Sequence, residues 1–274
     1  MKLGRRPVQL LVAAVAAGLA PARAEDAVPK ELADVGIDER PGAVLPQDLV
    51  FCNQDGRTVR LGDYLGREQP TIFVLAYYRC PMLCSLVLNG LTKGLRQATW
   101  RVGERFRVVT VSIDPADTPE LAKAKRENQI AAYGHPVDGA GWDFLVGDAA
   151  GIQRLTSTLG FRYRYDQESQ QFAHAAGAFV VTPDGRLSRT LYGIEFPERH
   201  LRLALVEAGG GKLGSAWDKV ILFCYHYDPQ ARSYVLAAVQ VMRIGSLISL
   251  VLMALLIVRL VRRKNAVAPT EKMA

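Results

Sequence analysis

Two cysteines are the residues of this sequence best suited to chemistry. Cys80 and Cys84 are separated by three residues and directly follow an apolar run of strand length. A helix that begins here would carry both sulfurs on one face of its first turn, and its positive N-terminal end lowers the pKa of a thiol. The resulting thiolates could attack a disulfide, form one with each other, or bind a soft metal ion. The cysteine pair alone leaves these alternatives open.

His174 is the histidine that could complete a metal site with these thiolates, because two sulfurs and an imidazole suit copper or zinc. It stands in a run of small residues just before a predicted strand, and we expect this turn to face the start of the cysteine-bearing helix. Packing in the core is the alternative for His174 taken by itself. His135, in a loop beside a proline, and His200, on the last predicted helix of the folded domain, have positions typical of surface or packing residues.

Strand and helix signals alternate along the middle of the chain. Apolar runs predict strands at 71–78, 106–113, 142–146, 178–182 and 187–192, and helical spacing predicts helices at 85–97, 119–133, 149–159 and 197–208. Such alternation produces βαβ units and a central sheet with helices on both faces. The last two strands form an antiparallel hairpin around a Pro-Asp-Gly turn, which makes the sheet mixed. The predicted fold is α/β, with a thioredoxin-like mixed sheet flanked by helices.

The two ends of the chain predict export and membrane attachment. Residues 1–24 have a basic start, a short apolar run and a small-x-small cleavage motif, as secretory signal peptides do, with an uncleaved anchor helix as the alternative. Residues 244–261 form an apolar run that, with some preceding residues, could cross a bilayer, and a core or amphipathic helix is the weaker reading. Basic residues 262–264 follow, so the positive-inside rule puts the tail 262–274 in the cytoplasm.

Composition limits the class of partner. The 274-residue chain has a formal net charge of +7, but the positive charge is concentrated in the two ends and the residues between them are close to neutral. This distribution suits membrane targeting, so we do not expect a nucleic-acid partner. The predicted location is the cell (inner) membrane, in a single pass, with the soluble domain on the periplasmic side.

The motifs around the candidate ligands resemble those of the Sco/SenC family. They are Tyr77-Tyr78-Arg79-Cys80-Pro81-Met82-Leu83-Cys84, Val111-Ser112-Ile113-Asp114-Pro115 with Asp117-Thr118-Pro119, Phe172-Ala173-His174, and Thr182-Pro183-Asp184-Gly185. The resemblance implies a thioredoxin-fold copper chaperone for the binuclear copper site of cytochrome c oxidase subunit II. It implies that Cys80, Cys84 and His174 bind copper, as Cu(I) or Cu(II). It also places Asp114 near the site, where it orients a ligand or partner; a turn role at the start of the next helix is the alternative.

With this resemblance, the chain divides into six predicted parts. These are a signal peptide at 1–24, an extended lead-in at 25–45, a thioredoxin-like copper-binding domain at 46–210, a linker at 211–243, a transmembrane helix at 244–261 and a cytoplasmic tail at 262–274. Three features depart from the commoner family pattern. Ala173 stands where an acid often precedes the ligand histidine, the tether is C-terminal, and Cys52 replaces a polar residue.

Further sulfur and imidazole groups could serve as accessories. Cys224 and His226 would share one face of an extended strand, where they form either a second soft-metal site or part of a packed aromatic segment. A disulfide between Cys52 and Cys224 is a further alternative. Met82 offers either a thioether ligand or apolar packing.

Three functions from different classes are compatible with these residues. The first is a copper chaperone that delivers copper to the oxidase subunit. The second is an extracytoplasmic thiol-disulfide oxidoreductase, in which Cys80 attacks and Cys84 resolves, so that the acceptor cysteines stay reduced. The third is a copper or redox sensor. Expected partners are subunit II, other periplasmic copper or thiol carriers, and membrane lipid through the C-terminal helix. His174 distinguishes a copper chaperone from a pure oxidoreductase, because the oxidoreductase needs no imidazole there. We therefore favour a chaperone over an enzyme.

Overall fold

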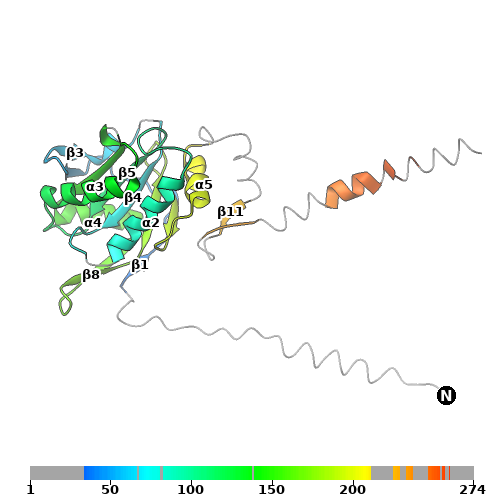
Figure 1. Cartoon of the computed structure of the whole chain (residues 1–274). Helices are drawn as coiled ribbons and strands as arrows, with labels where there is room; N and C mark the ends of the chain where they lie inside the picture. Colours follow the sequence, from blue (N-terminus) through cyan, green and yellow to red (C-terminus); the bar gives the residue numbers. More distant parts are fainter. Residues whose placement is uncertain are drawn as a thin grey trace, which may run out of the picture. The chain divides into compact units, whose positions relative to one another are not determined.

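The computed structural model divides the chain into two units, residues 1–34 and 35–274, and the fold described below belongs to the second (Figure 1). The structure describes residues 34–66, 68–80, 83–137, 139–210, 225–228, 233–236, 246–253, 255–256 and 259; for residues 83, 84, 140, 225–228 and 233–236 it describes the backbone alone. The predicted signal peptide, residues 25–33 of the lead-in and the predicted cytoplasmic tail lie outside the described residues.

A seven-stranded mixed sheet forms the centre of the domain, in the order β10-β9-β4-β5-β6-β2-β3. The strands are β2 (Val50–Asn53), β3 (Thr58–Arg60), β4 (Thr71–Ala76), β5 (Arg107–Ser112), β6 (Trp142–Val146), β9 (Gly177–Val181) and β10 (Leu187–Tyr192). Strands β4, β5 and β6 are parallel, and the flanking pairs are antiparallel. All residues of β4, β6 and β9 are buried, as expected for strands covered on both faces. The predicted mixed sheet is confirmed.

Among the described residues, four helices flank this sheet: α2 (Leu83–Gln97), α3 (Pro119–Tyr133), α4 (Ala149–Leu159) and α5 (Glu198–Ala208). Helix α2 packs against both α3 and α5, whereas α4 packs against strand β7 (Phe161–Asp166). The predicted bounds of α3 and α4 are confirmed. These bounds were predictable because local capping residues set them. The Thr118 side chain accepts a hydrogen bond from Leu121 N at the start of α3, and Asp148 accepts one from Gly151 N at the start of α4. Short 3₁₀ turns occur at Leu61–Tyr64 and Gly139–Gly141.

A second, three-stranded sheet was not predicted. It has the order β1-β7-β8, with β1 (Gly36–Ile37), β7 (Phe161–Asp166) and β8 (Gln171–His174). Both pairings are antiparallel. This sheet matters for function because its last residue is His174, which therefore ends a strand instead of lying in an isolated turn.

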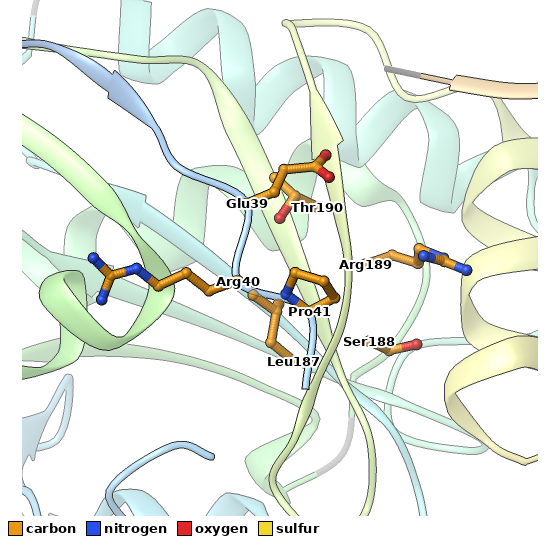
Figure 2. A pocket seen from close by; sticks show the side chains of 7 residues that line it. All are labelled: Glu39, Arg40, Pro41, Leu187, Ser188, Arg189 and Thr190. Atoms are coloured by element: carbon orange, nitrogen blue, oxygen red, sulfur yellow. The ribbon is translucent and has the colours of Figure 1, made fainter. Parts of the chain in front are cut away.

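The end of the predicted lead-in is ordered along the outer edge of β10. Gly42 N donates to Leu187 O at 2.7 Å, Leu187 N donates to Ala43 O at 2.8 Å, and Leu45 N donates to Gly185 O at 2.8 Å. Figure 2 shows Glu39, Arg40 and Pro41 beside residues 187–190 of β10. The crevice between them, of about 10 Å³, has room for no more than a water molecule. The segment therefore covers a sheet edge that would otherwise expose unpaired backbone groups.

Beyond α5, the structure describes a β-hairpin and a short helical stretch. The hairpin consists of β11 (Tyr225–Asp228) and β12 (Ser233–Leu236), which pair antiparallel. Residues 246–253 are helical. Within the described parts of the chain, no helix has both the length and the apolar character needed to span a bilayer. Of the predicted transmembrane segment 244–261, residues 244–245, 254, 257–258 and 260–261 lie outside the described residues.

Candidate metal centre

Cys80 ends a tight turn that leaves the central strand β4. The Cys80 backbone N–H donates to Tyr77 O at 3.3 Å, so Tyr78 and Arg79 are the two central residues of this turn. Tyr78 anchors the turn in the sheet, since its hydroxyl donates to Leu145 O at 2.7 Å and lies 3.1 Å from Thr110 O. Burial, with a further contribution from the charge of Asp117, raises the pKa of Tyr78, so this phenol stays a neutral donor.

The turn leads into α2, which starts at Leu83. Cys80 is 8% exposed and belongs to the buried core. Cys80 precedes the helix, so the prediction that one helical turn carries both sulfurs is wrong for Cys80. Cys84 is the second residue of α2, and its side chain lies outside the described residues. Met82 also lies outside them.

His174 is the last residue of β8, opposite Tyr163 of β7. Its side chain is buried, and Nδ1 lies 2.8 Å from the backbone oxygen of Ala175. A carbonyl can only accept, so Nδ1 carries the proton and the neutral ring has its lone pair on Nε2. Burial lowers the pKa of His174, against an opposing contribution from the Ala175 hydrogen bond. A neutral imidazole with a defined tautomer is the form of histidine that binds a metal ion.

Tyr77 connects the cysteine turn to the histidine. Its ring stands edge-on to the His174 ring, with centroids 6.0 Å apart, and packs on Phe172 at 5.4 Å. The carbonyl of the same residue accepts the Cys80 N–H. The structure therefore brings His174 to the turn that carries Cys80, as the sequence led us to expect. Among the described side chains there is no group of three or more His, Cys, Asp or Glu that could bind a metal ion, and Cys84 is not one of those side chains.

Asp114 lies in the loop between β5 and α3. Its Oδ1 accepts a hydrogen bond of 2.8 Å from Ala116 N, which shapes the turn before α3. It also lines an open cleft of about 570 Å³ together with Tyr77, Arg79 and Phe172. Burial, and then the charge of Asp114, raise the pKa of Tyr163. A turn role for Asp114 is thus visible, and its orienting role toward a ligand or partner stays a prediction.

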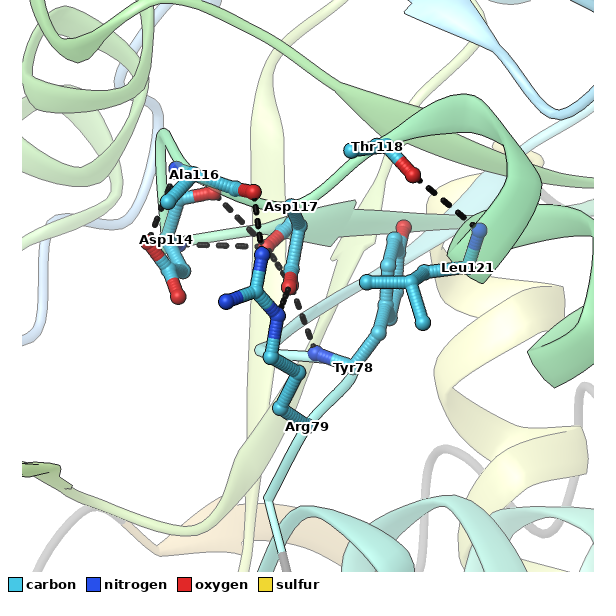
Figure 3. Close-up of polar contacts among 8 residues, drawn as sticks. Tyr78, Arg79, Asp114, Ala116, Asp117, Thr118 and Leu121 are labelled. Atoms are coloured by element: carbon cyan, nitrogen blue, oxygen red, sulfur yellow. Dashed lines mark hydrogen bonds and ion pairs between the residues drawn. The ribbon is translucent and has the colours of Figure 1, made fainter.

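Asp117 is a residue of this region whose role sequence reasoning missed. Its side chain is fully buried, and Oδ2 accepts hydrogen bonds of 2.7 Å from both Tyr78 N and Ser112 Oγ. Arg79 Nε forms an ion pair with Oδ1 at 3.3 Å, and the same guanidinium donates to Ala116 O (Figure 3). No local sequence pattern predicts these contacts, because Tyr78 is 39 residues from Asp117 in the sequence.

The remaining candidate residues lie away from this centre or outside the described residues. The His135 ring packs edge-on against Tyr133, and burial lowers the pKa of His200 on α5; both are packing residues. Cys52 is a free, half-buried thiol on β2, and burial raises its pKa. Cys224 lies outside the described residues, and His226 is described only as backbone of β11. The accessory site and the Cys52–Cys224 disulfide stay predictions.

The family model of SCO1/SenC matches residues 38–204, which include both cysteines and His174. The chain belongs to the SCO1/SenC family. A search of curated proteins finds no match for this SCO1/SenC chain.

Several solved structures are similar to the chain. A putative electron transfer protein from Aquifex aeolicus VF5 is 25% identical, with a TM-score of 0.56 over 63% of this chain and 96% of that one. BsSco, described as a member of the Sco family of cytochrome c oxidase assembly proteins with a disulfide switch, is 21% identical, with a TM-score of 0.50 over 63% and 97%. Arabidopsis thaliana ScoI, solved with copper bound, is 18% identical, with a TM-score of 0.49 over 62% and 98%.

Proposed function

We propose that this protein binds a copper ion through Cys80, Cys84 and His174 and delivers it to the binuclear copper site of cytochrome c oxidase subunit II during assembly. The observation that carries the proposal is the state of His174. It is a buried, neutral imidazole with Nδ1 hydrogen-bonded to a carbonyl, and it lies against the residue that begins the Cys80 turn. Membership of the SCO1/SenC family supports the same function.

The donor chemistry fits copper. Thiolates are soft ligands that prefer Cu(I), and an imidazole is a good ligand for both Cu(I) and Cu(II). Cys80 lies in the turn that leads into α2, which starts at Leu83. His174 holds its proton on Nδ1, so it offers Nε2 without first losing a proton. Such a set binds copper and can release it by ligand exchange to an acceptor that has similar donors.

The oxidoreductase alternative uses the same thiols. In that reaction the Cys80 thiolate attacks an acceptor disulfide, Cys84 attacks the resulting mixed disulfide, and the chain leaves oxidised while the acceptor leaves reduced. The disulfide switch described for BsSco favours keeping this alternative. The burial of Cys80, at 8% exposure, opposes it, because a protein disulfide must reach the attacking sulfur.

We also propose that the C-terminal segment anchors the domain to the inner membrane from the periplasmic side. The described large apolar side chains between Leu247 and Leu256 are all more than half exposed, and a bilayer would remove them from water. The basic cluster 262–264 follows this segment and supports a cytoplasmic C-terminus.

Copper transfer tests the proposed delivery. The full chain, loaded with Cu(I) under reducing conditions, is mixed with copper-free subunit II, and the absorption of the binuclear site is followed. We expect transfer from the wild type and from Cys52→Ser, whose substituted thiol lies on β2 outside the site, and none from Cys80→Ser. A wild-type chain that loads copper and transfers none would overturn delivery. A copper-free chain that instead reduces the acceptor disulfide would support the oxidoreductase.

A further inference from the structure

Asp117 holds the segment that immediately precedes Cys80. Oδ2 of its carboxylate accepts hydrogen bonds from the backbone N–H of Tyr78 and the hydroxyl of Ser112, and Oδ1 forms an ion pair with the guanidinium of Arg79. The Asp117 side chain has no exposed surface, whereas that of Arg79 is 52% exposed. The arginine therefore lies over the buried acid, and its second contact, to Ala116 O, fastens it to the loop that carries Asp117 (Figure 3).

The two residues held by Asp117 through backbone or side chain are the central pair of the Cys80 turn. The turn begins at Tyr77, whose ring contacts His174, and ends at Cys80, whose N–H closes it. Because the carboxylate holds Tyr78 and Arg79 in place, it also fixes the position of Tyr77 relative to Cys80. One end faces the proposed histidine ligand and the other carries a proposed cysteine ligand.

A carboxylate suits this position better than an amide of the same shape. A carboxylate only accepts, and here Oδ2 accepts two hydrogen bonds while Oδ1 lies against the Arg79 guanidinium. An asparagine oxygen in the place of Oδ2 would still accept from Tyr78 N and Ser112 Oγ, but without the charge, and its NH₂ group would face the Arg79 guanidinium instead of pairing with it. Hydrogen bonds to a charged group are also the stronger ones in a buried site.

We infer that Asp117 is the positioning residue of the metal centre, holding the Tyr77–Cys80 turn so that Cys80 and His174 keep the geometry needed to share one copper ion. The inference rests on the proposed copper site. It assigns Asp117 no contact with copper: the residue acts through the turn.

The test compares Asp117→Asn with Asp143→Asn in the full chain. Asp143 is a matched control, since it is also a buried acid that accepts from neighbouring side chains, Tyr64 Oη at 2.7 Å and Gln54 Nε2 at 3.1 Å. It is the second residue of β6, at the opposite end of the parallel strands from the turn after β4. Asp117→Asn should weaken Cu(I) binding about tenfold or more, as loss of supporting contacts around a metal site does. It should also shift the sulfur-to-Cu(II) charge-transfer absorption, whereas Asp143→Asn should change neither.

Arg79→Ala serves as a second variant that removes only a half-exposed side chain and so leaves the fold intact. It should shift copper affinity in the same direction, by less. The inference would be overturned if both Asp117→Asn and Arg79→Ala had the copper affinity and absorption of the wild type and only a lower thermal stability. Asp117 would then be a structural residue.

A readout without copper separates this inference from the proposed function. With Cys52, Cys84 and Cys224 replaced by Ser, the rate of Cys80 alkylation reports how far the turn opens. Asp117→Asn should raise that rate about tenfold, because the hydrogen bonds at Oδ2 lose their charged acceptor and the ion pair with Arg79 is lost, and Asp143→Asn should not. An unchanged rate would contradict the positioning role even if wild-type copper binding is found. A raised rate in a chain that binds no copper would refute the copper site and leave the turn's support by Asp117 standing.

Discussion

At the residue scale, Tyr77 joins the two parts of the candidate site. Its ring meets His174 edge-on and its carbonyl receives the Cys80 N–H, so a single residue contacts both proposed ligand positions. A second aromatic ring, that of Phe161, lies tilted to the His174 ring with centroids 6.0 Å apart. The imidazole is thus held in a dry, aromatic environment, which is why its pKa falls and its neutral form is favoured.

Ala173 affects how much negative charge is placed near the His174 ring. Metal-binding histidines commonly donate their second ring nitrogen to a carboxylate or a carbonyl. Here the partner is the backbone oxygen of Ala175, and position 173 supplies no acid. A neutral carbonyl orients the ring as a carboxylate would, but adds less negative charge to it.

At the element scale, the position of α2 depends on a close approach to the segment before α5. A Cβ added at Gly94 would lie 2.0 Å from Phe196 O and 2.7 Å from Leu201 Cδ1, and one added at Gly90 would lie 1.8 Å from Ile194 O. Only glycine allows the helix backbone to lie this near. The start of α2, where the cysteines are, is therefore set partly by packing along its middle.

Gly94→Ala should destabilise the domain by about 1–3 kcal/mol, since the neighbouring backbone must move to admit a methyl group. Chemical denaturation measures the change. Lys93→Ala is the matched control, because Lys93 is exposed on the same helix and its substitution should stay within about 0.5 kcal/mol of wild type. Equal stability of the two variants would show that α2 can move away without cost.

Elements with local signals were predictable from the sequence. Helices α3 and α4 were predicted to the residue because Thr118 and Asp148 cap them and Gly134 and Gly160 end them in the left-handed conformation. The strand β6, Trp142–Val146, is a short apolar run bounded by turn residues and was predicted equally well. In each case the information lies within a few residues of the boundary.

Elements that depend on distant partners were not predictable in the same way. Strand β7 alternates aromatic and charged residues and pairs with both β1 and β8, and β8 has four residues and pairs with β7. The ligand candidates Cys80, Cys84 and His174 could be proposed from residue type and family motifs. The support from Asp117 could not, because its donors come from β5 and from the turn after β4 and meet only in the folded domain.

At the scale of the whole molecule, the ends of the chain carry the prediction of membrane attachment. A reporter active only in the cytoplasm, fused after Lys264, should be active, and the same reporter fused after Gly210 should be silent, because the positive-inside rule retains the basic cluster. The two fusions control for each other in expression level. Activity of the Gly210 fusion would place the folded domain in the cytoplasm and contradict the proposed location.

Copper binding by His174→Ala tests the central claim most directly, because the imidazole separates a copper carrier from a dithiol oxidoreductase. The full, reduced chain is titrated with Cu(I) against a competing chelator, beside His174→Ala and the control His200→Ala, whose ring lies on α5. We predict stoichiometric copper in the wild type and in His200→Ala, and at least about a tenfold loss of affinity in His174→Ala with dithiol reactivity retained. Unchanged copper affinity in His174→Ala would contradict the account.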